Sequence, residues 1–329
     1  MNNGNGNQAS EKKYHRVLLL LIVGMAAFVS AMNELNQLHS FTLETGQLLA
    51  SWSDMVVPTA KASAPVISNS CVAAVEPQGS RKSDEFRWSG NIPVGNSIEV
   101  KGINGEIVAD LASGSEVQVV AIKKARRSDV DSVHIKVEQN AAGVTICALY
   151  PNDSGQYPSS CSGDDDNKRS SDDGSASNDI RHNDVSVDFT VHVPANVNFV
   201  GKTINGGISV LNLNSNVVTK TINGSIKIST TGYAEAATIN GEINAKFLNG
   251  SWPSSLSFKT LNGEINLDLP ANLNAAVDIK TLNGAINSDF PLTVTETKGK
   301  KAVRGTIGSG GRDLVLKTLN GSINLRIAG

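Results

Sequence analysis

The 329-residue chain is nearly neutral, with 29 basic residues, 31 acidic residues and a formal net charge of -2. This balance creates no field that would gather nucleic acid, so we expect no nucleic-acid partner. Aromatic residues make up 5% of the chain and offer few rings on which bases or sugars could stack, whereas 40% hydrophobic residues suffice to fill a core.

Residues 1–31 have the pattern of an export signal. Lys12, Lys13 and Arg16 precede an apolar run over residues 17–29, and small residues follow through Ala31. We therefore expect an exported protein that resides in the periplasm, at the cell surface or in the medium. The apolar run is short for a membrane span, which needs about 20 residues. A signal anchor over residues 17–31 that is not cleaved is the alternative.

The remainder divides into a linker and a strand-rich domain. Residues 32–85 combine several prolines with many serines and alanines, which predicts a linker of low order. Over residues 86–329 apolar and polar side chains alternate, as in residues 133–137, and this pattern predicts strands with one buried face. A polar, Asp-rich stretch at about residues 151–183 is predicted to be a surface insertion. Its aspartates lack the spacing of a calcium loop, so we expect no metal there.

Three cysteines are too few for a disulfide scaffold, and no Cys-x-x-Cys pair suggests zinc. In an oxidising compartment, Cys147 and Cys161 could pair and close the polar loop between them, which would leave Cys71 over. The alternative is that both thiols stay free, because connectivity cannot be read from a sequence.

The strongest signal in the chain is a repeated unit, Thr-(Ile/Leu)-Asn-Gly-x-Ile. Six full copies lie within residues 203–323, and a related copy begins at Gly102. We interpret residues 303–307 as a degenerate copy that divides the last, wide gap between units. The Asn-Gly pairs of the seven copies are Asn104-Gly105, Asn205-Gly206, Asn223-Gly224, Asn240-Gly241, Asn262-Gly263, Asn283-Gly284 and Asn320-Gly321.

The repeat predicts two short strands joined by a corner, because apolar residues alternate on both sides of each Asn-Gly pair. We expect Asn and Gly at the corner because both tolerate positive φ, so Gly284→Val should be costly.

Two all-β architectures fit this repeat. In a β-solenoid each unit is one coil, and like residues stack about 4.8 Å apart in parallel ladders. In an antiparallel meander each Asn-Gly is a hairpin turn, which would pair Phe258 with Leu267. The recurrence of identical Thr, Asn and Ile favours the solenoid, because stacking in register places like side chains against each other.

Three stretches of the chain carry a resemblance to a known group. They are Gly-Val-Thr-Ile-Cys-Ala-Leu-Tyr-Pro at residues 143–151, Asn-Asp-Val-Ser-Val-Asp-Phe-Thr-Val-His-Val-Pro at residues 183–194, and the Thr-x-Asn-Gly units. Together they resemble the bacterial putative-adhesin β-strand-repeat family, an exported domain of unknown function. The resemblance covers about residue 86 to the C-terminus and implies a right-handed β-helix-like fold. It implies no catalytic residues.

Lysines directly before the repeat Thr form the candidate binding site. In a solenoid they would lie in a column, which could attract an anionic surface polymer. The alternative is a solvated face that also prevents unwanted pairing of strand edges. The lysines are Lys202, Lys220, Lys259, Lys280 and Lys317.

Support for catalysis is weak. The sequence contains no Gly-x-Ser-x-Gly, no His-Glu-x-x-His and no phosphate loop, so we expect neither an enzyme nor a cofactor. Glu264 and Asp268 are the neighbouring carboxylates that would have to act in a glycan-active enzyme, and this is the weakest of our hypotheses.

We therefore expect an adhesin-like binding module for cell-envelope or extracellular polymers, with an envelope polysaccharide or another envelope protein as its partner. The alternative is a structural or signalling component of the envelope that acts through a protein partner and a membrane anchor. In either case the sequence predicts membrane contact only through the N-terminal segment, if that segment is not cleaved.

Overall fold

The computed structural model describes residues 82–328 except residues 153, 162–182, 251, 253 and 298–300. The expected signal segment, almost all of the expected linker, Cys71 and most of the Asp-rich stretch lie outside the described residues. Within this part the chain forms β-strands and one short 3-10 helix, Val130–Ser132. The strands make a ten-stranded sheet, called sheet A here, and an eleven-stranded sheet, called sheet B.

Seven coils, each with one strand in either sheet, form the body of the domain. Sheet B contains the strands that lead into the Asn-Gly corners, and sheet A contains those that leave them. The sheet B strands are β2 (Ser97–Lys101), β8 (Asn198–Lys202), β10 (Val217–Lys220), β12 (Ala234–Ala237), β14 (Leu256–Lys259), β16 (Ala275–Lys280) and β20 (Arg312–Lys317). The sheet A strands are β3 (Ile107–Leu111), β9 (Ile208–Leu213), β11 (Ile226–Thr230), β13 (Ile243–Phe247), β15 (Ile265–Leu269), β17 (Ile286–Ser288) and β21 (Ile323–Ile327).

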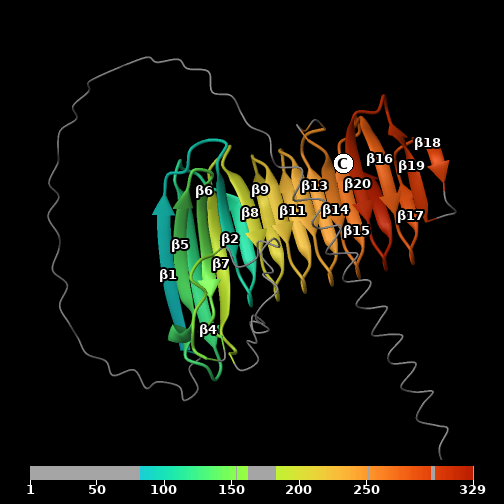
Figure 1. Cartoon of the computed structure of the whole chain (residues 1–329). Coiled ribbons are helices and arrows are strands. Elements are labelled where there is room, and N and C mark those ends of the chain that lie inside the picture. Colours follow the sequence, from blue (N-terminus) through green and yellow to red (C-terminus); the bar gives the residue numbers. More distant parts are fainter. Residues whose placement is uncertain are drawn as a thin grey trace, which may run out of the picture. The chain divides into compact units, whose positions relative to one another are not determined.

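The coils stack in parallel, which confirms the predicted solenoid. Phe258 and Leu267 lie in different sheets, on β14 and β15, so the meander that would pair them is wrong. Figure 1 shows the strands of successive coils side by side along the domain. Parallel pairing in register places like repeat positions against each other, as in Ile226 beside Ile243.

The stacking order departs from the sequence order. The coil of β20 and β21 lies between the coil of β14 and β15 and that of β16 and β17. At the other end, the β2–β3 coil stacks directly on the β8–β9 coil, although a long stretch of chain separates them. Strands that are distant in the chain are therefore hydrogen-bonded neighbours, and the last coil is held on both sides (Figure 1).

Additional strands extend the sheets at both ends of the stack. On the β2–β3 side these are β1 (Lys82–Gly90), β4 (Val117–Ala125) and β7 (Ser186–Val193) in sheet A, and β5 (His134–Asn140) and β6 (Gly143–Leu149) in sheet B. The other end of sheet B is extended by β18 (Leu292–Thr297) and β19 (Ala302–Ile307). Most of these strands pair antiparallel, as β1 does with β4 and β18 with β19.

The interpretation of residues 303–307 as a degenerate repeat copy is wrong. They lie in β19, which runs antiparallel to both β16 and β18. This segment has no Asn-Gly pair, so it cannot join the stack of corners. It instead covers the backbone edge of β16, which would otherwise be open to pairing with another chain.

One hydrophobic core lies between the two sheets. The repeat Ile is fully buried at Ile208, Ile226, Ile243 and Ile265, and the opposite sheet contributes side chains such as Phe258. Burying a side chain of this size stabilises a fold by about 1.5–3 kcal/mol, so a row of them provides much of the free energy of folding. The described strands enclose this core among themselves, so we expect residues 82–329 to fold without the segment that precedes them.

Candidate functional site

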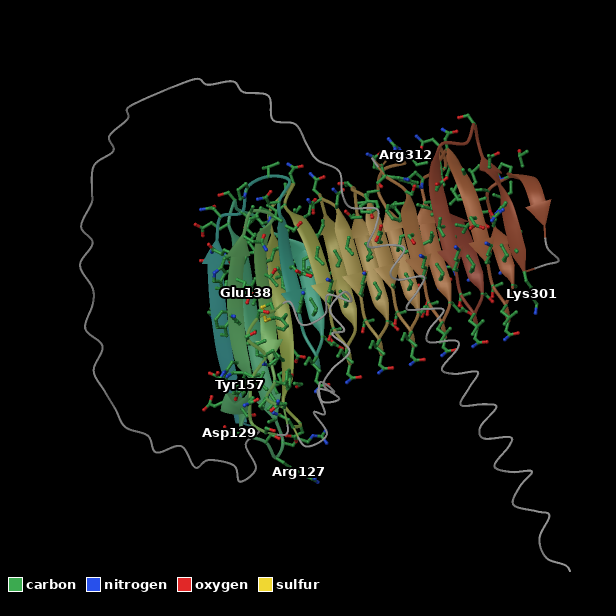
Figure 2. The ribbon with its side chains drawn as sticks, in the orientation of Figure 1. Arg127, Asp129, Glu138, Tyr157, Lys301 and Arg312 are labelled. Carbon is green, nitrogen blue, oxygen red and sulfur yellow. A yellow bond between two sulfur atoms is a disulfide. The ribbon has the colours of Figure 1, made fainter. Side chains whose placement is uncertain are left out.

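The Asn-Gly corners form one long edge of the domain, called the corner edge here. Figure 2 shows Lys301 at this edge, where its carbonyl accepts from the Thr281 N–H at 2.8 Å, and Arg312 at the opposite edge. Each corner Asn after Asn104 donates from Nδ2 to Oδ1 of the Asn in the adjacent coil at 2.7–2.9 Å. In stacking order the ladder is Asn104, Asn205, Asn223, Asn240, Asn262, Asn320 and Asn283. All six bonds point the same way, so each amide polarises the next.

A buried threonine hydroxyl supports six of the seven corners from inside. Thr221 Oγ1 donates to the Gly206 carbonyl of the adjacent coil at 2.9 Å, and Thr260 Oγ1 does the same to Gly241 at 2.9 Å. Thr203, Thr238, Thr281 and Thr318 repeat this contact. A hydrogen bond of this kind contributes about 1 kcal/mol to stability. The repeat therefore requires Thr for its hydroxyl, which makes this hydrogen bond, and not only because Thr favours β-strands.

The corner glycines are required because neighbouring coils approach closely. A Cβ on Gly263 would lie 1.9 Å from the Gly241 carbonyl oxygen, and one on Gly224 would lie 2.0 Å from that of Gly206. We expected Asn and Gly at the corners because both tolerate a positive φ. For the corner asparagines this reason is wrong: among the described residues other than glycine, only Asn196 and Asn212 have a positive φ, and both lie outside the corners. It applies to Gly105, whose φ is 126°.

The five expected lysines lie in one row on the outer face of sheet B, together with Lys101. Lys101 escaped the sequence pattern because Gly102, not Thr, follows it. Ala237 of β12 occupies the equivalent position between Lys220 and Lys259. In stacking order the lysine row consists of Lys101, Lys202, Lys220, Lys259, Lys317 and Lys280. Six of the seven coils thus present an ammonium group at the same register position.

Acidic residues two positions earlier in the strands partly neutralise this row. Glu99 lies 2.9 Å from Lys202 Nζ and 3.7 Å from Lys101 Nζ. Burial by itself would raise the pKa of the Glu99 carboxyl, but the two ammonium groups outweigh it, so the pKa lies below its usual value. Asp278 lies 3.5 Å from Lys280 and 3.8 Å from Lys317. Strand carboxylates thus pair with Lys101 and Lys202 at one end of the row and with Lys280 and Lys317 at the other.

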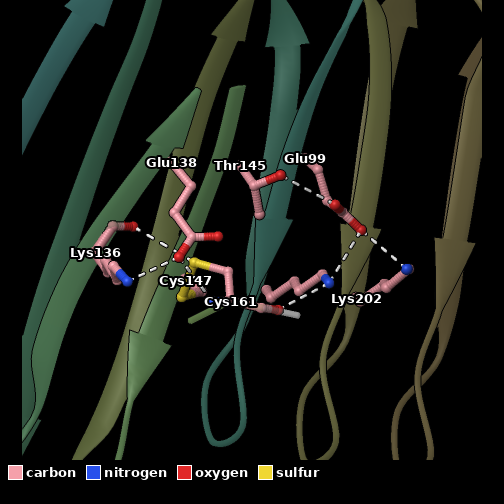
Figure 3. Close-up of polar contacts among 8 residues, drawn as sticks. Glu99, Lys136, Glu138, Thr145, Cys147, Cys161 and Lys202 are labelled. Carbon is pink, nitrogen blue, oxygen red and sulfur yellow. Dashed lines mark hydrogen bonds and ion pairs between the residues drawn. A yellow bond between two sulfur atoms is a disulfide. The ribbon is translucent and has the colours of Figure 1, made fainter. Parts of the chain in front are cut away.

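A disulfide between Cys147 and Cys161 lies where the lysine row ends (Figure 3). Cys147 is the register partner of Lys101, and Lys101 Nζ donates to the Cys161 carbonyl at 3.0 Å. Glu138 accepts from the Cys161 N–H at 3.1 Å and from Lys136 at 2.8 Å. The Lys136 ammonium lowers the pKa of the Glu138 carboxyl. The disulfide and its polar contacts fasten the loop after β6 to the outer face of sheet B.

Sequence reasoning missed a row of exposed apolar side chains at the corner edge. The Ile or Leu before each Asn was expected to belong to the apolar pattern of the strands, yet in four of the seven coils it is exposed to solvent. Its exposed fraction is 36% at Ile204, 39% at Ile222, 53% at Leu282 and 37% at Leu319. In stacking order this Ile/Leu row consists of Ile103, Ile204, Ile222, Ile239, Leu261, Leu319 and Leu282. The alternation could have revealed it, because the residue after a buried Thr must point outward.

The two carboxylates considered for glycan chemistry lie at different places in the fold. Glu264 is exposed at its corner, and Asp268 lies on the outer face of sheet A with Lys246 and Arg326 as register partners. Among the described residues no group of three or more His, Cys, Asp or Glu is placed to hold a metal ion. The described part of the chain also contains no helix long and apolar enough to cross a membrane.

Comparison with known proteins identifies the family. The family model described as Toastrack DUF4097 matches residues 93–326, far more than half of the chain. No curated protein matches. A "putative cell adhesion protein" from Clostridium sporogenes has a solved structure that is similar at 10% identity and a TM-score of 0.40, covering 74% of this chain and 99% of that one. A "putative adhesin" from Bacteroides fragilis is similar at 11% identity and a TM-score of 0.32, covering 74% and 97%. The match of the family model confirms the resemblance noted from the sequence, and the chain belongs to the Toastrack DUF4097 family.

Proposed function

We propose that this chain is an exported, non-enzymatic β-solenoid that binds an anionic component of the cell envelope, in the manner of an adhesin, through the lysine row. The observation that supports this proposal is the alignment of an ammonium group in six of the seven coils at one register position. Neighbouring strands of a sheet are about 4.8 Å apart, so the row presents positive charge at this short interval except at Ala237, where one position is skipped.

Such a row binds by repetition rather than by strong single contacts. One exposed ion pair contributes about 0–1 kcal/mol, and a polymer that meets several lysines at once gains from each. The Debye length of about 10 Å at 0.1 M salt spans roughly two coil spacings. Binding should therefore be firm at low salt and weaken steeply as salt is added.

Retention on an immobilised polyuronate such as alginate tests this proposal. Replacing Lys259 and Lys280 with Gln removes two charges from the row and should lower the salt concentration at which the protein elutes. The matched control replaces Lys227 and Lys246, two exposed lysines on the outer face of sheet A, and should elute as the unmodified protein does. The proposal would be overturned if replacing Lys259 and Lys280 left the eluting salt concentration unchanged, or if replacing Lys227 and Lys246 lowered it equally.

Export and the absence of catalysis are separate parts of the proposal. Export is supported by the basic and apolar pattern of residues 12–31, and the N-terminus of the chain recovered from producing cells should follow Ala31. A chain that retains this segment and fractionates with membranes would instead support the anchored structural component. Cleavage of a polysaccharide that Asp268→Asn abolishes would contradict a non-enzymatic role.

A further inference from the structure

The Ile/Leu row has an apolar side chain in all seven coils, and four of them, Ile204, Ile222, Leu282 and Leu319, are exposed. Ile103, at one end of the row, packs partly against the core. In six of the seven coils the residue before it is a buried Thr, and in six the Ile after the Asn-Gly pair is buried, whereas Leu282 is 53% and Ile222 39% exposed. Neighbouring copies shield one another only in part. A continuous apolar stripe on an otherwise polar edge is typical of a surface that another molecule or a membrane covers.

The Ile/Leu row runs beside the lysine row along the whole stack. In six of the seven coils a lysine precedes the Ile or Leu by two residues, as in Lys202 and Ile204, with the buried Thr203 between them. Both side chains face outward on the same border of the corner edge. The other border carries Glu106 and, in two further coils, Glu242 and Glu264, all of them exposed. The corner edge is therefore basic and apolar on one side and acidic on the other.

We propose that this border of the corner edge docks on a bilayer that contains anionic lipid. The Ile/Leu row enters the interface between headgroups and acyl chains, and the lysine row contacts the phosphates. This inference rests on the proposed function of the lysine row and names the anionic component that the row binds. It also adds a second membrane contact to the N-terminal segment, which was the one expected from the sequence.

The arrangement favours a bilayer over a hydrated polysaccharide. A polysaccharide would neutralise the lysines but would offer no apolar layer to the Ile/Leu row. A bilayer presents negative charge and hydrocarbon in the same order as the two rows do. The stack is also long enough to follow a flat surface, since seven coils at about 4.8 Å extend over roughly 29 Å. The six lysines outnumber the three carboxylates two positions earlier in the strands, Glu99, Glu235 and Asp278, so the border keeps an excess of positive charge.

The test uses residues 82–329, which hold every described strand and their common core, so the N-terminal apolar run cannot contribute. Binding is measured by flotation with vesicles of phosphatidylcholine alone or of phosphatidylcholine mixed with phosphatidylglycerol. We expect binding to the mixed vesicles, and we expect the Ile204→Ser, Ile222→Ser, Leu282→Ser variant to weaken it about tenfold or more. The control replaces Val94, Leu111 and Leu248, which are exposed away from the corner edge, and should bind as the parent protein does.

A second measurement uses single tryptophan variants, so its result does not depend on whether the triple serine variant folds. Leu282→Trp places an indole in the Ile/Leu row, and its fluorescence should shift to the blue when mixed vesicles are added. Leu248→Trp, at a site of similar exposure outside the corner edge, should show no shift. Equal urea midpoints of the serine variants and the parent protein would show that changes in binding do not come from unfolding.

The outcomes separate this inference from the proposed function. Vesicle binding that depends on both the Ile/Leu row and the lysine row supports the inference. Two results would overturn the inference: vesicle binding that is the same in the serine variant as in the parent protein, or retention on alginate without any vesicle binding. In both cases the lysine row keeps its proposed function. If the Lys259→Gln, Lys280→Gln variant keeps both its vesicle binding and its alginate retention, the proposed function would be overturned instead.

Discussion

Asn320 Nδ2 donates a hydrogen bond to Asn262 Oδ1 at 2.7 Å, although the two residues are 58 positions apart. Asn320 Oδ1 in turn accepts from Asn283 Nδ2 at 2.7 Å. The last repeat of the chain is thus inserted between two earlier ones, and its amide connects coils that are successive in sequence but not in space. This insertion places the C-terminal coil sixth of the seven coils, between two coils that precede it in the sequence.

Replacing Asn320 with Asp should destabilise the domain in a pH-dependent way. The new carboxylate would face Oδ1 of the Asn262 side chain in place of a donor, which favours the protonated form and raises the folded-state pKa above the unfolded value. The stability of the variant is then retained below the unfolded pKa, about 3.9, and lost as the pH rises through the folded pKa. Urea unfolding should show a loss of about 1 kcal/mol near neutral pH. Asn91→Asp, at an exposed site, is the control, and a loss independent of pH would contradict the prediction.

Replacing Gly263 with Ala should cost about 3 kcal/mol or more, because the added Cβ would lie 1.9 Å from a backbone oxygen of the adjacent coil. That backbone cannot withdraw without breaking the bond from the Gly241 N–H to the Asn262 carbonyl, which measures 3.0 Å. Gly114→Ala, where the Cβ would meet nothing within 4 Å, should leave the urea midpoint nearly unchanged. Similar midpoints for the two variants would show that the coils can separate at the corner.

Reducing the Cys147–Cys161 disulfide should destabilise the domain by about 3 kcal/mol, the amount associated with closing a loop of this length. The measurement is urea unfolding with and without a thiol reductant. The Cys147→Ser, Cys161→Ser variant should have the stability of the reduced protein and should not respond to reductant. Alkylation of either cysteine in the folded, unreduced protein would contradict the bond.

The Glu99→Gln variant should lose stability at neutral pH and approach the parent protein in acid. The pKa of Glu99 is depressed in the folded state, so its carboxylate stabilises the fold above the unfolded pKa of about 4.3. This contribution disappears as the pH falls through the folded-state pKa. Unfolding curves of the two proteins from neutral pH to about pH 3 test this, and a difference that stays constant over this range would show that Lys202 and Lys101 do not depress the pKa.

The corner shows how far the sequence predicted the candidate site. The repeat indicated that the asparagines stack and that the lysines share one position, because both follow from identical units placed in register. The repeat did not reveal why Gly is present, since the contact between Gly263 and the Gly241 carbonyl involves two coils. For the same reason, the sequence did not assign Lys101 to the lysine row, because its place there depends on the pairing with Lys202 of another coil.

The sequence by itself determined an all-β repeat domain with seven Asn-Gly corners and favoured the solenoid over the meander, because alternation and turn chemistry act over a few residues. Only the tertiary structure decided which coil neighbours which, and that residues 303–307 run antiparallel at the end of sheet B. The physical reason is that every corner offers its neighbour the same amide, hydroxyl and backbone groups. Contacts between alike coils are therefore nearly equal in energy, and the order of stacking is selected by the connections and the antiparallel end strands, which the repeat does not encode.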